Sequence, residues 1–179
     1  AGMALAAPPP APAAVPRAPL FAHDTLREPR LKALAGLDVA AFDRCVAAGD
    51  LRLATIMLAA ILESAILDHV IPRRTEFNLN GSADTWNPVD LLLSALGDRA
   101  SPKDRSFAYH LFAARGLLRP AVQMVTPTVV TPESFERLYE FVQRALHGLG
   151  FGAPPQTLPP GMLTVEAVRA MTAGNAPTA

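Results

Sequence analysis

The feature that most constrains this chain is an apolar run over residues 53–67, which reads LATIMLAAILESAIL. On a helical wheel its apolar side chains fall on every side, which is typical of a helix that other helices surround. The run is about 15 residues long, shorter than the roughly 20 that a membrane span needs, and it contains Glu63, with Asp68 and His69 close behind. We therefore predict a buried core helix and no contact with a membrane.

Start and stop residues divide the rest of the central region into further helices. Asp50 is the expected N-cap of the core helix, which should end at Pro72. No segment shows the strict alternation of apolar and polar residues that is typical of a half-buried strand. The sequence thus predicts an all-α fold, a helical bundle of about four main helices. The expected helices cover residues 26–34 (ended by Gly36), 39–48 (capped by Asp38), 51–71, 88–96, 101–118 (ended by Pro120) and 132–147 (stopped by Gly148 and Gly150).

Proline marks the two ends of the chain, where many of its 18 prolines lie. Residues 1–22 are mostly alanine and proline, a composition that cannot bury enough surface to offset the entropy of ordering. We expect a disordered arm there, a bundle domain over residues 24–150, and a proline-rich tail over 151–179 with a short helical pattern at 165–171.

Charge and cysteine content exclude several classes of function. Sixteen acidic and sixteen basic side chains give a net charge of zero, so no strong field attracts nucleic acid or an anionic membrane. The single cysteine, Cys45, excludes an internal disulfide and a thiolate metal cluster, which fits the cytoplasm. The four histidines lack the spacing of metal ligands, and no glycine-rich phosphate loop is present. We expect neither a metal nor a cofactor.

Two charged residues fall on apolar helix faces. At a step of about 100° per residue, Arg115 lies in the middle of the apolar sector of the helix expected over 101–118, and Arg119 lies beside it. Burying an arginine is expensive unless it is paired or opens onto a cleft. The core helix offers Glu63 as a partner, and we predict an interhelical Glu63–Arg115 ion pair. Two interpretations stay open: a structural pair that fixes helix register, or a functional site.

The order of these features over residues 40–148 resembles the HEPN-like helical domains (higher eukaryote and prokaryote nucleotide-binding). Those domains carry a helix of the type apolar-Leu-Glu-x-x-Leu, matched here by ILESAIL at 61–67. A loop and a leucine-patterned helix follow, and then a helix that ends in Arg-Asn-x-x-His-Pro. The matching stretch here is RGLLRP, residues 115–120.

The resemblance implies either RNA cleavage or a domain that has lost this activity. In that family the arginine and histidine face each other across a homodimer and cleave RNA without a metal. Arg115 matches the family arginine, Gly116 replaces the polar residue after it, and Arg119 stands where the histidine belongs. An arginine stays protonated and cannot act as a general base, so two arginines suit the binding of a phosphate or carboxylate.

The leading hypothesis is therefore a non-catalytic HEPN-like bundle that acts in recognition or assembly as a homodimer, with Arg115, Arg119 and Glu63 as binding residues. The resemblance also implies a bacterial defence or toxin–antitoxin setting, with protein or RNA as the partner. One alternative is an active metal-independent ribonuclease that uses Arg115 with His110, or with His69. A second is a structural adaptor that docks through its proline-rich arms.

Overall fold

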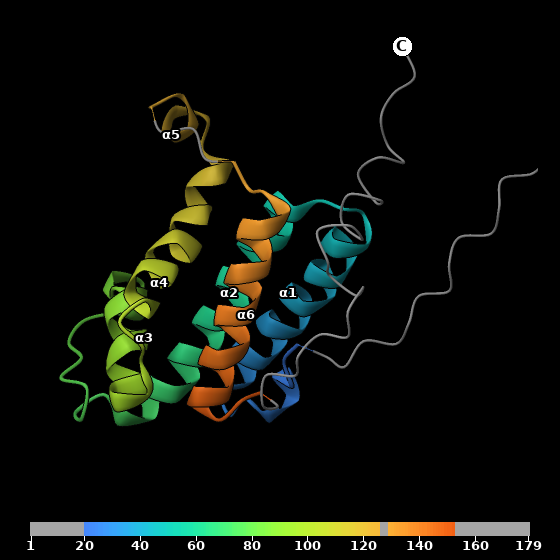
Figure 1. Ribbon diagram of the computed structural model, residues 1–179. Coiled ribbons are helices and arrows are strands. Elements are labelled where there is room, and N and C mark those ends of the chain that lie inside the picture. The colour runs from blue at the N-terminus through green and yellow to red at the C-terminus, as the bar shows by residue number, and fades with distance from the viewer. Residues whose placement is uncertain (1–19, 126–128, 153–179) are drawn as a thin grey trace, which may run out of the picture.

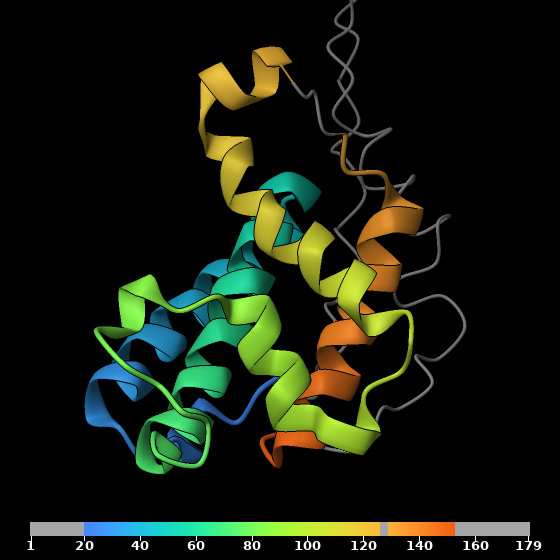
Figure 2. The same ribbon diagram turned by 90° about the vertical axis from the view of Figure 1, so that its left-hand side faces the viewer.

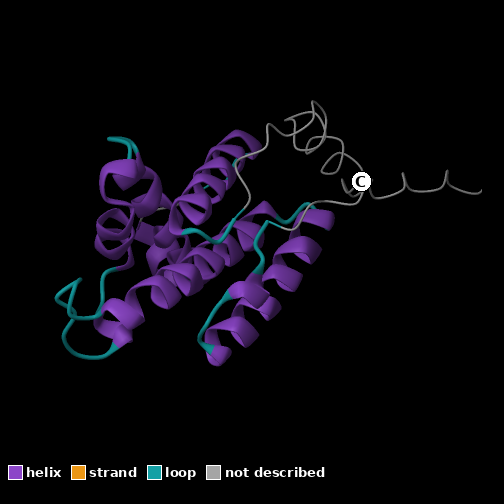
Figure 3. Ribbon diagram, turned by 90° about the horizontal axis from the view of Figure 1, so that it is seen from below, coloured by secondary structure: helices purple, strands orange, loops and turns teal. Residues whose placement is uncertain are grey.

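Helices form every regular element in the part of the chain that the computed structural model describes, residues 20–125 and 129–152. The predicted all-α bundle is confirmed (Figures 1 and 3). Its helices are α1 (Pro29–Ala47), α2 (Leu51–Val70), α3 (Pro88–Leu96), α4 (Asp104–Ala113), α5 (Pro120–Val125) and α6 (Pro132–Leu149). Short 3-10 turns join them, namely η1 (His23–Thr25), η2 (Ile71–Arg73), η3 (Ala83–Thr85), η4 (Gly97–Arg99) and η5 (Ala114–Leu118).

Helix α2 is the centre of the bundle, as its apolar run predicts. The Asp50 side chain caps it by accepting a hydrogen bond from the N–H of Leu53 at 3.0 Å. Its α-helical part ends at Val70, and Pro72 lies in the η2 turn that follows. The helix is long and apolar enough to cross a membrane, but most of it is buried against α1, α3, α4 and α6. It therefore serves as the core helix of this bundle.

The predicted break in the first part of the chain is wrong. Gly36 does not end a helix and Asp38 does not cap one, because both lie inside the continuous helix α1. A Cβ atom at position 36 would lie 3.1 Å from the His23 ring, so glycine allows the close approach of η1 to α1. Gly36, predicted to end a helix, is instead a position where two parts of the chain pack closely.

The helix predicted over residues 101–118 also differs. It begins near the expected place, where Asp104 Oδ2 accepts a hydrogen bond from the N–H of Ser101 at 2.7 Å. The α-helix ends at Ala113, however, and the chain tightens into the 3-10 turn η5. Arg119 is extended (φ −106°, ψ 104°), as the residue before a proline usually is, and Pro120 begins α5 instead of only ending the previous helix.

The start of α6 follows the prediction in detail. The Thr131 hydroxyl accepts a hydrogen bond from the N–H of Ser134, and the Ser134 hydroxyl accepts one from the N–H of Thr131, which together form a capping box. The helix ends at Leu149, and the expected stop Gly150 is its C-cap, with a φ of 88° that favours glycine. Gly148, expected as a stop, lies inside the helix against Leu96 of α3.

The packed bundle extends beyond both predicted limits. Phe21 is 1% exposed and Phe151 is 8% exposed, and their rings meet edge to face with centroids 6.0 Å apart. These two residues therefore belong to the bundle and not to the arm or the tail. The remainder of the predicted arm, the rest of the tail and the helical pattern at 165–171 lie outside the described residues.

Helix α5 stands apart from the rest of the bundle. Figures 1 and 2 both show it at one end, beyond the packed helices. None of its residues is buried, and its main contact is with η5. Gly116 allows that contact, because a Cβ atom there would lie 3.2 Å from Cγ1 of Val122.

Candidate functional site

The predicted ion pair between the core helix and the fourth helix region is confirmed. Nη2 of Arg115, in η5, pairs with Oε2 of Glu63 on α2. The same guanidinium lies over the ring of Phe112, with its central carbon 5.7 Å from the ring centroid. Arg115 is thus held by a carboxylate and by an aromatic face at once.

The pair is only partly buried. The Arg115 side chain is 47% exposed and that of Glu63 is 31% exposed. The prediction assumed α-helical steps to Leu118, whereas the α-helix ends at Ala113 and Arg115 is the second residue of the 3-10 turn η5. Partial burial lowers the pKa of Arg115, but an arginine starts so far above neutral pH that the guanidinium stays charged. A pair this exposed contributes about 1 kcal/mol at most.

Arg119 lies four residues further along, at the junction between η5 and α5. Its backbone carbonyl accepts hydrogen bonds from the N–H groups of Val122 and Gln123, which fixes the start of α5. Its side chain is exposed and forms no ion pair within residues 20–125 and 129–152. The structure brings Glu63 and Arg115 together, whereas Arg119 is a separate cation at the base of α5.

The two histidines of the ribonuclease alternative lie elsewhere. His110 is on α4, where its Nδ1 is 2.7 Å from the carbonyl oxygen of Ser106 and its ring lines a cavity next to α6. His69 is near the end of α2, edge-on to Phe77. Burial, followed by the charges of Arg73 and Arg99, lowers the pKa of His69. Among the described residues, neither histidine is in contact with Arg115.

The structure also contains a buried carboxylate that sequence reasoning passed over. The Asp68 side chain is 1% exposed, and its Oδ1 accepts hydrogen bonds from the N–H groups of Arg27 and Glu28, each at 2.8 Å. Arg27 Nε lies 3.8 Å from Oδ2. Asp68 therefore fastens the chain before α1 to the end of α2. Its position after a long apolar run was the only signal in the sequence.

The second feature that sequence reasoning missed is the surface we call the α5 projection, formed by Leu118, Met124 and Val125. Leu118 is 58% exposed, Met124 86% and Val125 83%. All three fall within eight residues around Arg119: Leu118 ends η5, and Met124 and Val125 lie on α5, the helix that stands apart from the bundle. Large apolar side chains that gather on a protruding element indicate an interaction surface. The signal was the apolar, proline-punctuated stretch that follows Arg115.

No site for a metal can be built from the described side chains, because no three of their histidine, cysteine, aspartate and glutamate residues gather closely enough. Comparison with known proteins gives no match: no family model, no curated protein and no solved structure matches this chain.

Proposed function

We propose that this chain is a non-catalytic, HEPN-like recognition or assembly module that forms a homodimer through the α5 projection. The observation that carries the proposal is the exposure of Met124 and Val125, 86% and 83%, on a helix whose main contact among the described residues is with η5. Burying one such side chain is worth roughly 1.5–3 kcal/mol, so covering the surface provides a substantial driving force.

A second copy of the chain suits this surface. In a two-fold contact the same patch lies on both partners, and an apolar patch is complementary to itself without any matching of charges. The net charge of zero means that two copies do not repel each other at long range. Arg119, at the edge of the patch, would remain on the polar rim of such an interface.

The loss of catalysis in the proposal follows from the two arginines. Arg115 is engaged by Glu63 and Phe112, and Arg119 cannot accept a proton. A role in a bacterial defence or toxin–antitoxin system, in the cytoplasm, is part of the proposal and has the resemblance of residues 40–148 as its support.

Sedimentation equilibrium of the full chain tests the assembly. We expect a dimer for the wild type and a monomer for Met124→Glu, because a buried unpaired carboxylate opposes association. Leu37→Glu is the matched control, since Leu37 is 69% exposed on α1, away from the projection, and should leave the dimer intact. A monomeric wild type would refute the proposal, and so would a dimer that only Leu37→Glu dissociates.

The ribonuclease alternative keeps one specific observation in its favour. Almost half of the Arg115 side chain is exposed, so a phosphate could reach it. Purified protein incubated with mixed RNA in EDTA, beside Arg115→Ala and His110→Ala, separates the two functions on a denaturing gel. We expect intact RNA in every lane. Cleavage by the wild type that either substitution abolishes would establish the enzyme instead.

A further inference from the structure

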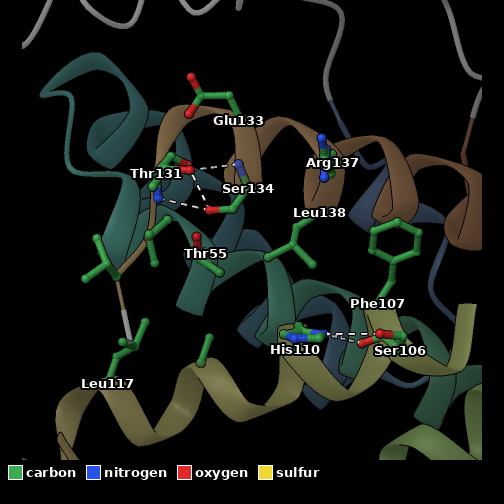
Figure 4. A pocket seen from close by; sticks show the side chains of 13 residues that line it. Thr55, Ser106, Phe107, His110, Leu117, Thr131, Glu133, Ser134, Arg137 and Leu138 are labelled. Atoms are coloured by element: carbon green, nitrogen blue, oxygen red, sulfur yellow. Dashed lines mark hydrogen bonds between the residues drawn. The ribbon is translucent and has the colours of Figure 1, made fainter. Parts of the chain in front are cut away.

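A cavity of about 360 Å³ lies between α4 and α6, with α2 behind it (Figure 4). This volume is within the range of sites for small molecules. Its walls include side chains from all three helices and from the segment before α6. The lining residues include Thr55, Phe107, His110, Leu117, Arg137 and Leu138.

Most of the inner wall is apolar. Phe107 and Leu117 lie on the α4–η5 side, and Leu138 points into the space from α6 in Figure 4. Thr55, at the back, is 1% exposed, and its hydroxyl already donates a hydrogen bond to the carbonyl oxygen of Leu51 at 2.7 Å. The wall therefore suits a compact apolar body such as one aromatic ring.

Two polar side chains lie on opposite walls of this cavity. Arg137 comes from α6, is exposed, and forms no ion pair with any described residue. A guanidinium presents several N–H donors in a plane and pairs best with a carboxylate or a phosphate. Glu133, one turn earlier on α6, also lines the cavity, but its carboxylate points away from His110 in Figure 4, which leaves Arg137 as the cation available to a ligand.

His110 lies on the α4 wall of the cavity, whereas Arg137 lies on the α6 wall. The His110 ring offers a hydrogen-bond acceptor, whereas the guanidinium offers only donors. Its Nδ1 lies 2.7 Å from the carbonyl oxygen of Ser106, and a carbonyl can only accept, so Nδ1 carries the proton. In the neutral ring Nε2 is then an acceptor, and no described residue donates to it. A ligand that fits would bring a hydroxyl or an N–H to this end.

We infer that this cavity binds a small aromatic carboxylate that carries a hydrogen-bond donor at its far end. The carboxylate pairs with Arg137, the ring lies against Leu138 and Phe107, and the donor reaches Nε2 of His110. The cavity contains none of the three residues of the α5 projection. Ligand binding there and the proposed dimer can therefore be tested independently.

Three related probes separate the parts of this inference. 4-Hydroxyphenylacetate has all the groups, phenylacetate lacks the hydroxyl, and 4-hydroxyphenethyl alcohol lacks the carboxylate. Binding to the full chain is measured by calorimetry and by NMR titration. We expect 4-hydroxyphenylacetate to bind and the alcohol to bind about tenfold more weakly, the effect of one lost charge-assisted contact.

Variants assign each end of the probe. Arg137→Gln should weaken 4-hydroxyphenylacetate about tenfold and leave the alcohol unchanged. His110→Phe keeps an aromatic ring and should abolish the preference for 4-hydroxyphenylacetate over phenylacetate. Arg105→Gln is the control, because Arg105 is also an exposed arginine but pairs with Asp90 outside the cavity. Equal affinities for acid and alcohol, no effect of Arg137→Gln, or no binding of any probe at millimolar concentration would overturn the inference.

Discussion

Replacing Asp68 with alanine should destabilise the bundle by about 3–6 kcal/mol. The Asp68 carboxylate is almost fully buried and accepts hydrogen bonds at 2.8 Å from the N–H groups of Arg27 and Glu28. A hydrogen bond to a charged group contributes about 1.5–3 kcal/mol, and the substitution removes two of them. It also leaves both partly buried N–H groups without an acceptor. The loss is a large share of the 5–15 kcal/mol that ordinarily stabilises a domain.

Urea unfolding followed by circular dichroism measures this loss, and amide hydrogen exchange at Arg27 and Glu28 locates it. Asp68→Asn keeps an acceptor oxygen and should lose only about 1–2 kcal/mol. Asp43→Ala, on an exposed position of α1, is the control and should stay within about 0.5 kcal/mol of the wild type. If Asp68→Ala loses less than about 1 kcal/mol while exchange at the two amides is unchanged, the reasoning is refuted.

Three further predictions concern other parts of the bundle. Arg115→Ala should cost only about 1 kcal/mol in urea unfolding, because its pair with Glu63 is half exposed; a loss above about 3 kcal/mol would mean that the pair acts as a buried one. Gly148→Ala places a Cβ atom 2.7 Å from Cδ2 of Leu96 and should lower stability by about 1–2 kcal/mol, whereas an unchanged melting temperature would show that Leu96 moves aside freely. The pKa of His69 is lowered in the folded protein, so the unfolded chain binds the proton first: stability should be full above about pH 6.5 and fall as the pH drops through the lower folded value. That fall should be smaller in His69→Gln, and an identical pH profile would contradict the assignment.

Local signals in the sequence were sufficient for the fold class and for most helix starts. Asp50 and Thr131 cap their helices as predicted because a capping side chain needs only the backbone of the next few residues. The Glu63–Arg115 pair could be predicted for a related reason: an apolar helix face that contains one charge requires a partner, and the core helix offered one.

The errors arose where distant contacts or backbone geometry decide. Gly36 does not end a helix. The His23 ring, brought close by η1, lies where a side chain at position 36 would project. The 3-10 turn that contains Arg115 was not predicted, because apolar periodicity does not distinguish the end of an α-helix from a 3-10 turn. Asp68 was passed over because its backbone partners lie 41 and 40 residues earlier in the sequence. The cavity beside His110 depends on how three helices meet, which no local pattern specifies.

During synthesis, α2 is made before most of the helices that cover it in the folded bundle. When α2 has been synthesised, only α1 is available to pack against it, because α3, α4 and α6 come later in the chain. From the end of α2 at Val70 to the end of α6 at Leu149 is about 80 residues, or roughly 4–16 s of synthesis at about 5–20 residues per second. During that interval a helix apolar enough to enter a bilayer has one side open to water. The α1–α2 hairpin, fastened by Asp68, is thus the first pairing that can cover part of the apolar surface of α2 as the chain is made.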